Sequence, residues 1–236
     1  AIADTFPVFE TRALTDDELT LANQQMEFLT AFFDDLFARR RLNPRDDLST
    51  ALATANEGGN SLSPEELSTS VIGLFGAGFE TTAHMIGNGL YLLGAHPDER
   101  AKLGVDLSLA SAATEEITRF ESSLQATYRT ALSDTMVGGQ PVKKGERILT
   151  IVAAANRDAA VFKQPEAFVI DARQEKPLTF GGGIHYCVGA ELARLEGRVF
   201  LEELFSTYPN FEVDTESARL RQAFLFRGFE YLGVTL

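Results

Sequence analysis

One cysteine lies where a run of glycines passes into a predicted helix, in the stretch FGGGIHYCVGAELARLE (residues 180–196). This residue, Cys187, is the only cysteine in the chain. At the start of a helix, exposed backbone N–H groups and the helix dipole favour an anion, here a thiolate. The neighbouring glycines let the backbone approach closely and direct its N–H groups at the sulfur. A thiolate in this position can act as a nucleophile or bind a metal, and the alternative is a small, buried and inert cysteine.

The residues around Cys187 disfavour several kinds of site. A nucleophile needs a base within reach, and His185, on the same loop, has an unusual geometry for a catalytic pair. A zinc site needs about four ligands, but His84, His96 and His185 are scattered along the chain. A dinucleotide-binding glycine loop fails because Tyr186 occupies the third glycine position. The remaining possibility is a thiolate that is the only protein ligand of a metal. Haem fits this possibility, because the porphyrin supplies four nitrogen ligands and the protein supplies one axial sulfur.

The same stretch resembles the haem-binding signature of the cytochrome P450 monooxygenases. The matching positions are Phe180, Gly183, His185, Cys187 and Gly189. The resemblance implies haem b (iron protoporphyrin IX) as cofactor, with Cys187 as the axial ligand of its iron. It also implies that Arg129 and His185 bind the haem propionates. A contact between an arginine and a carboxylate is chemically apt. The residues implied to contact the cofactor are Cys187, Phe180, Gly181, His185, Gly189, Arg129, Ala77 and Gly78.

A second match lies in AGFETT (residues 77–82), which resembles the oxygen-activating stretch of the family. The resemblance implies that Glu80 and Thr81 deliver protons to bound oxygen, and that Ala77 and Gly78 line a local opening of a helix over the haem. A hydroxyl beside a carboxylate can hold a proton-relay water. The alternative is a helix that packs closely on a neighbour through small residues, with Glu80 in solvent.

A third match is EEITR, the Glu-x-x-Arg pair of the family, here Glu116 and Arg119. At positions i and i+3 the two side chains share a helix face and can pair. Alone, such a pair is a solvated contact worth a few tenths of a kcal/mol. The resemblance implies instead a buried structural pair that organises the segment before the cysteine loop. The usual third member, an arginine, is replaced by Ala167, and Arg157 is the candidate substitute.

A fourth match, SSLQATYRTALSD (residues 122–134), resembles the family's segment that passes the haem edge. The resemblance places substrate contacts at Leu124, Ala126 and Thr127, and at Phe226 in the tail.

The elements that must position these residues are mainly helical. Capping boxes begin helices at Thr15 and Ser63, and the second helix, about 64–95, ends before His96-Pro97. This long helix contains six glycines, each costing about 1 kcal/mol relative to alanine, so a local benefit should offset them. Other helices are predicted for 46–55, 109–123 and about 188–208, with short strands from Thr130 to about 156 and in the tail after 222.

These patterns predict an α+β protein, mainly α with small β-sheets, and the resemblance implies the cytochrome P450 fold. The resemblance also implies that residues 1–236 form one haem-thiolate monooxygenase domain that corresponds to the C-terminal part of the family, so we expect a fragment of a longer, bacterial-type protein. The chain has 236 residues, a net charge of −13 and 44% hydrophobic residues. The negative charge argues against nucleic acid and anionic membranes as partners. The lone cysteine and the absence of a secretory signal favour the cytoplasm.

The function implied by the resemblance is O2-dependent hydroxylation of an apolar small organic substrate. Electrons would come from a separate ferredoxin or flavoprotein reductase. Arg194 and Arg198 could dock an acidic donor, or simply balance Glu191 and Glu196 on a solvated face. The alternative is a haem-binding or scaffold protein without oxygenase activity, and a peroxide-driven variant is a lesser one. The retained Glu80–Thr81 pair argues against both.

Overall fold

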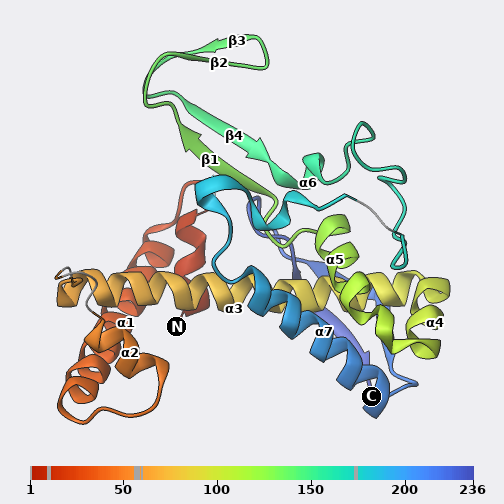
Figure 1. The fold of residues 1–236 in the computed structure, drawn as a ribbon, viewed down its shortest axis with the longest axis horizontal. Coiled ribbons are helices and arrows are strands. Elements are labelled where there is room, and N and C mark those ends of the chain that lie inside the picture. The colour runs from red at the N-terminus through yellow and green to blue at the C-terminus, as the bar shows by residue number, and fades with distance from the viewer. Residues whose placement is uncertain (1, 10–11, 56–58, 60, 173–174) are drawn as a thin grey trace. The chain divides into compact units, whose positions relative to one another are not determined.

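The computed structural model describes residues 2–9, 12–55, 59, 61–172 and 175–236. The described part is mainly helical with small two-stranded antiparallel sheets, as the sequence predicted (Figure 1). Its contacts divide the chain into two compact units, Ala1–Glu80 and Thr81–Leu236, and the boundary falls inside one long helix. None of the described helices is both long and apolar enough to cross a membrane.

The first unit contains a 3-10 segment, two helices and the first half of the long helix. α1 begins with the predicted capping box: the Glu18 backbone N–H donates to the Thr15 hydroxyl at 3.2 Å, and the Thr15 N–H donates to the Glu18 carboxylate at 2.9 Å. Because these bonds satisfy donors that a helix start leaves open, they fix where α1 begins. The elements are η1 (Ile2–Phe9), α1 (Asp16–Leu42), α2 (Leu48–Thr54) and α3 (Pro64–Ala95).

The core of the first unit forms where α1 meets the start of α3. Phe33 and Phe37 on α1 are buried, and the Phe33 ring lies edge-on to Phe75 of α3 with centroids 6.2 Å apart. The Ser68 hydroxyl donates to the Asp34 carboxylate beside this contact. Leu19, in the first turns of α1, is exposed.

The long helix α3 has the predicted bounds. The Glu66 backbone N–H donates to the Ser63 hydroxyl at 3.1 Å and the Ser63 N–H donates to the Glu66 carboxylate at 2.8 Å. The helix then continues to Ala95, and Pro97 starts the next helix. The local opening that the resemblance implied at residues 77–81 does not interrupt it.

The second unit holds the remaining helices around one apolar core. The sequence prediction missed α4, although Pro97 at its first position and Lys102 in its last turn are ordinary helix signals. The helices are α4 (Pro97–Val105), α5 (Ala110–Phe120), α6 (Val152–Ala155) and α7 (Ala190–Thr207), with 3-10 turns η2 (Leu107–Leu109), η3 (Leu178–Phe180) and η4 (Gly183–His185). The buried core residues are Met85, Leu92, Leu93, Leu103, Ala110, Ala113, Ile117, Phe168, Ile170, Leu201, Leu204, Phe205 and Phe211.

Three antiparallel hairpins complete the described part of the second unit. Figure 1 shows the β2–β3 hairpin at the outer end of the β1–β4 ribbon, and its Gly138-Gly139 turn has φ of 55° and 79°. Positive φ at both positions suits a tight hairpin turn. Strand β1 starts before the predicted Thr130, and β5, rich in charged and hydroxyl side chains, was not predicted. The strands are β1 (Ala126–Thr130), β2 (Thr135–Val137), β3 (Gln140–Val142), β4 (Arg147–Ile151), β5 (Glu212–Leu220) and β6 (Phe229–Thr235).

The glycines of α3 serve different purposes. A Cβ at Gly89 would lie 2.9 Å from the Ile117 side chain, and one at Gly94 would lie 2.8 Å from Cβ of Val213. At these positions glycine lets α5 and β5 approach the helix closely, which offsets its cost. A Cβ at Gly73 or Gly78 would meet no atom within 4 Å, so close packing does not account for those two.

We therefore expect Gly94→Ala to destabilise the protein and Gly73→Ala to stabilise it. Overpacking against Val213 and Thr215 costs about 1–3 kcal/mol, more than the roughly 1 kcal/mol that alanine gains in a helix. Gly73→Ala should gain the higher helix propensity of alanine without any overpacking, because a Cβ at this position would meet no atom within 4 Å. Urea unfolding followed by circular dichroism measures both, and an equal rise in stability for the two variants would contradict the packing of β5 on α3.

Candidate functional site

The cysteine loop is a closed turn that ends at Cys187, immediately before α7. The Cys187 backbone N–H donates to the Phe180 carbonyl at 2.8 Å, and the Ala190 N–H donates to the Cys187 carbonyl at 3.2 Å. Gly181 and Gly183 have φ of 71° and 60°, a conformation that favours glycine. A Cβ at Gly181 would also lie only 3.0 Å from the His185 carbonyl oxygen. The fold of the loop therefore requires glycine at positions 181 and 183.

The outer face of the loop combines one thiol with apolar side chains. Cys187 is exposed, and the nearby Ile184 and Val188 are 97% and 87% exposed. Side chains of this kind seldom face water unless they meet another surface. One soft sulfur ligand among apolar groups matches a flat, apolar porphyrin whose metal needs a single protein ligand. The residues present therefore fit a haem, and the alternative of a buried cysteine is wrong.

The two basic residues assigned to the propionates are both exposed. His185 ends the 3-10 turn that precedes Cys187. Arg129 lies on β1, where its guanidinium donates to the Tyr128 carbonyl at 2.8 Å and to the Thr127 hydroxyl at 3.3 Å. An exposed guanidinium of this kind can bind a carboxylate, and both propionate roles remain predictions.

The acid–alcohol pair lies in the middle of α3, where the boundary between the two units falls. Glu80 is only 4% exposed, which contradicts the alternative of a carboxylate in solvent. Thr81 is half-buried, and Ala77 and Gly78, which lie near it around the helix, are exposed. Glu80 belongs to the first unit and Thr81 to the second, as does the whole cysteine loop.

Glu116 and Arg119 form a buried ion pair on α5. The guanidinium donates to both carboxylate oxygens, each at 2.7 Å, and the side chains of Arg119 and Glu116 are only 1% and 5% exposed. A two-bonded pair of this geometry is stronger than a single contact. The alternative of a solvated surface pair is wrong, because burial leaves almost no access to water.

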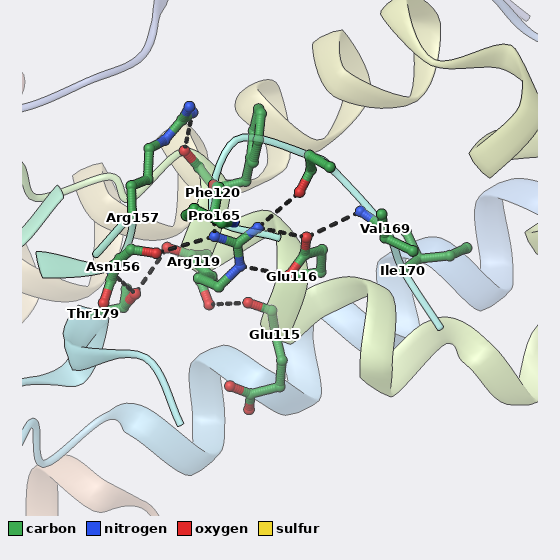
Figure 2. Close-up of polar contacts among 12 residues, drawn as sticks. Glu115, Glu116, Arg119, Phe120, Asn156, Arg157, Pro165, Val169, Ile170 and Thr179 are labelled. Atoms are coloured by element: carbon green, nitrogen blue, oxygen red, sulfur yellow. Dashed lines mark hydrogen bonds and ion pairs between the residues drawn. The ribbon is translucent and has the colours of Figure 1, made fainter. Parts of the chain in front are cut away.

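Arg119 also holds the irregular chain that follows α6, as Figure 2 shows. Its guanidinium donates to the main-chain carbonyls of Asn156 at 3.0 Å, Pro165 at 3.1 Å and Ala167 at 2.9 Å. The Val169 backbone N–H donates to Glu116 at 3.0 Å. The chain from 156 to 169 is thus fixed by one buried ion pair that binds its backbone.

The proposed substitute for the third arginine, Arg157, binds other groups. It donates to the Phe120 carbonyl at 2.7 Å and to Glu166 at 3.0 Å, and its guanidinium lies 3.8 Å from the centroid of the Phe120 ring. At Ala167, where the resemblance implied an arginine, the main-chain carbonyl accepts a hydrogen bond from Arg119.

Asn156 connects this network to the cysteine loop. It is fully buried, its side-chain amide donates to the Thr179 hydroxyl at 2.9 Å, and its side-chain oxygen accepts from the Leu178 N–H at 2.6 Å. Thr179 in turn donates to the Thr118 carbonyl of α5 at 2.8 Å. Leu178 and Thr179 directly precede the loop. The sequence analysis did not identify Asn156 as a site residue. The available signal was weak, because Asn156 is a single polar residue that follows three alanines.

The two arginines of α7 differ from each other. Arg198 pairs with Glu202 at 2.9 Å, because residues i and i+4 lie on one helix face. Arg194 does pair with Glu191, at 2.8 Å, and also binds Glu115 of α5. Burial opposes its charge, but hydrogen bonds to Glu115 and to the Tyr186 hydroxyl outweigh this and raise the pKa of Arg194.

The structure brings two of the four predicted substrate contacts together. Leu124 and Phe226 lie opposite one another in an isolated antiparallel bridge, flanked by the hydrogen bond from the Gln125 N–H to the Leu225 carbonyl at 2.8 Å. Ala126, in contrast, is buried on β1. Thr127 bonds to the Thr150 hydroxyl of β4 at 2.6 Å.

Comparisons with known proteins point to one family. The family model described as Cytochrome P450 matches residues 10–225. Vitamin D(3) 25-hydroxylase from Pseudonocardia autotrophica is 38% identical over 99% of this chain and 59% of its own length. 6-Deoxyerythronolide B hydroxylase from Saccharopolyspora erythraea is 38% identical over 87% of this chain and 52% of its own length.

A solved structure agrees with these relatives. P450BioI, determined in complex with a hexadec-9Z-enoic acid-ligated acyl carrier protein, matches with a TM-score of 0.92 and 33% identity. The match covers 100% of this chain and 60% of that one. The chain therefore spans between half and two thirds of the length of these relatives.

Proposed function

Because this chain belongs to the cytochrome P450 family, we propose that it is the cysteine-loop portion of a haem b-dependent monooxygenase that hydroxylates an apolar small organic molecule. The family implies a haem cofactor. The observation that carries the proposal is the exposed thiol of Cys187, presented by a closed glycine loop between apolar side chains.

Cys187 would hold the cofactor through Sγ. When bound, haem supplies the iron centre that activates O2 and inserts one oxygen atom into a C–H bond, and a thiolate ligand favours O–O cleavage. The backbone hydrogen bonds on either side of Cys187 hold the loop in its turn. The exposed Ile184 and Val188 would lie against the apolar cofactor. Arg129 and His185 would donate hydrogen bonds to the propionate carboxylates.

Glu80 and Thr81 would carry protons to the site. Glu80 is buried in α3 and Thr81 is half-buried directly after it. A carboxylate can give up and regain a proton, and a neighbouring hydroxyl can pass it on through one water. Ala77 and Gly78 keep this stretch free of bulk, because a Cβ at Gly78 would meet no atom within 4 Å.

The substrate would contact the bridge between Leu124 and Phe226, with Ala126 and Thr127 following on β1. The apolar character of Leu124 and Phe226 supports an apolar substrate. Two relatives are named as hydroxylases of vitamin D(3) and of 6-deoxyerythronolide B, which supports an organic molecule as substrate. Electrons would come from a separate ferredoxin or flavoprotein reductase, and the protein would work in the cytoplasm.

Isotope labelling tests the activity directly. The full-length haem-loaded protein is supplied with NADPH, a ferredoxin and its reductase, and 18O2, with vitamin D3 and hexadec-9Z-enoic acid as probe substrates. A monooxygenase puts one 18O atom into the product and releases the other as water. Haem binding with no labelled product from either probe under 18O2, and with no oxygenated product when a chemical surrogate oxidant supplies the oxygen atom, would support the alternative of a haem protein without oxygenase activity.

We expect Glu80→Gln and Thr81→Ala to slow O2-dependent turnover by about 10²-fold each, the usual contribution of a proton-transfer group. Product formation driven by added peroxide should change much less, because peroxide brings its own protons. Glu66→Gln, at the start of the same helix, is the control. Equal loss in the O2-driven and peroxide-driven reactions would contradict the proton-relay role.

A further inference from the structure

One side chain of α7 touches both ends of the cysteine loop. The Arg194 guanidinium lies 4.5 Å from the centroid of the Phe180 ring and donates to the Tyr186 hydroxyl at 2.9 Å. Its Nε donates to the carboxylate of Glu115, which lies on α5 and is 79 residues away in the sequence. The guanidinium therefore joins α7, α5 and the loop.

These contacts lie on either side of the bond that closes the loop. Phe180 accepts the hydrogen bond from the Cys187 N–H at 2.8 Å, and Tyr186 directly precedes Cys187. A planar guanidinium can stack on a ring and donate in its own plane at the same time. Stacking on the Phe180 ring fixes the start of the loop, and the hydrogen bond to the Tyr186 hydroxyl fixes the residue before Cys187.

The neighbouring arginine shows what an ordinary ion pair on this helix looks like. Arg198 pairs with Glu202 four residues on, and both side chains are more than a third exposed. Such a pair contributes a few tenths of a kcal/mol and orders nothing outside its own helix. Arg194 is less exposed, and outside its own helix its partners come from α5 and from both ends of the cysteine loop.

We propose that Arg194 is a positioning residue that holds the cysteine loop against α5 and so fixes the direction of the Cys187 sulfur. Any consequence for a bound haem rests on the proposed function, whereas the order of the loop itself does not. A guanidinium fork is needed, because an ammonium can keep the charge pair with Glu115 but cannot stack flat on Phe180 while it binds Tyr186.

The test compares Arg194→Ala and Arg194→Lys with the control Arg198→Ala in the full-length haem-loaded protein. Hydrogen exchange of the backbone amides in residues 180–189 reports the order of the loop. The Soret band of the reduced CO complex reports the sulfur ligand. We expect exchange in Arg194→Ala to rise by about tenfold or more, since hydrogen bonds to a charged group are lost. As the exchange rises, the fraction of the reduced CO complex that has a thiolate-type Soret band should fall.

Arg194→Lys should lie between the wild type and Arg194→Ala in both measurements, and Arg198→Ala should match the wild type. If Arg194→Ala exchanges no faster than Arg198→Ala, the proposal is overturned even where the wild type has a thiolate-type band. If Arg194→Ala loosens residues 180–189 but the wild type lacks that band, the positioning role holds and the proposed function fails. Should Arg194→Ala not fold, Glu115→Gln provides the same comparison through the loss of the charge partner.

Discussion

Replacing Cys187 with serine is expected to abolish the strongly red-shifted Soret band of the reduced CO complex. A thiolate bonds iron as a soft anionic ligand, whereas a serine hydroxyl stays protonated near neutral pH and binds iron weakly. The chain offers no replacement sulfur ligand of the same kind, because Cys187 is its only cysteine. We expect the variant to lose the band completely and to bind haem more weakly, as measured by absorption spectroscopy of the full-length protein.

The control for Cys187→Ser is the stability of the haem-free variant. Cys187 is exposed, and serine has nearly the same size, so the free energy of unfolding of the haem-free protein should change by no more than about 0.5 kcal/mol. A circular dichroism melt would detect a larger change. Retention of the band by Cys187→Ser would disprove the ligand assignment. A wild-type spectrum typical of histidine ligation would do the same.

Replacing Arg119 with alanine is expected to lower the free energy of unfolding by about 3–5 kcal/mol. The change would leave the Glu116 carboxylate buried at 5% exposure without its cation. It would also remove donors from the carbonyls of Asn156, Pro165 and Ala167. A buried group that loses its hydrogen bond keeps the full cost of leaving water, so the loss exceeds that of any exposed ion pair.

Urea unfolding measures this effect, with Arg157→Ala as the matched control. Arg157 also stacks on Phe120 and binds backbone, but it is partly exposed, so we expect a smaller loss of stability. Arg119→Lys should recover only part of the stability, because an ammonium cannot reach both carboxylate oxygens and the carbonyls at once. A loss below about 1 kcal/mol in Arg119→Ala would mean that the pair does not hold the 156–169 segment.

Features encoded by neighbouring residues could be predicted from the sequence. The starts of α1 and α3 depend on Thr15 with Glu18 and on Ser63 with Glu66, and each pair forms its bonds within three residues. The loop before Cys187 depends on glycines whose φ is positive, which other residues seldom adopt. The fold class followed from such local signals together with the family resemblance.

Features that depend on distant partners could not be predicted in the same way. The sequence shows that Glu116 and Arg119 can meet, but not that 156–169 covers them. Arg194 looked like one half of a helix-surface pair, because Glu115 and Phe180 come close only after α5, α7 and the loop pack together. Asn156 has the same character, since its partners Leu178 and Thr179 lie beyond an irregular segment.

The way Arg119 binds its surroundings has an evolutionary consequence. The carbonyl oxygens it binds belong to the main chain, and every amino acid carries one. A substitution at the exposed Ala167 can therefore change the side chain while the same main-chain oxygen still meets the guanidinium. Selection at this position should therefore act on the path of the main chain more strongly than on the side chain.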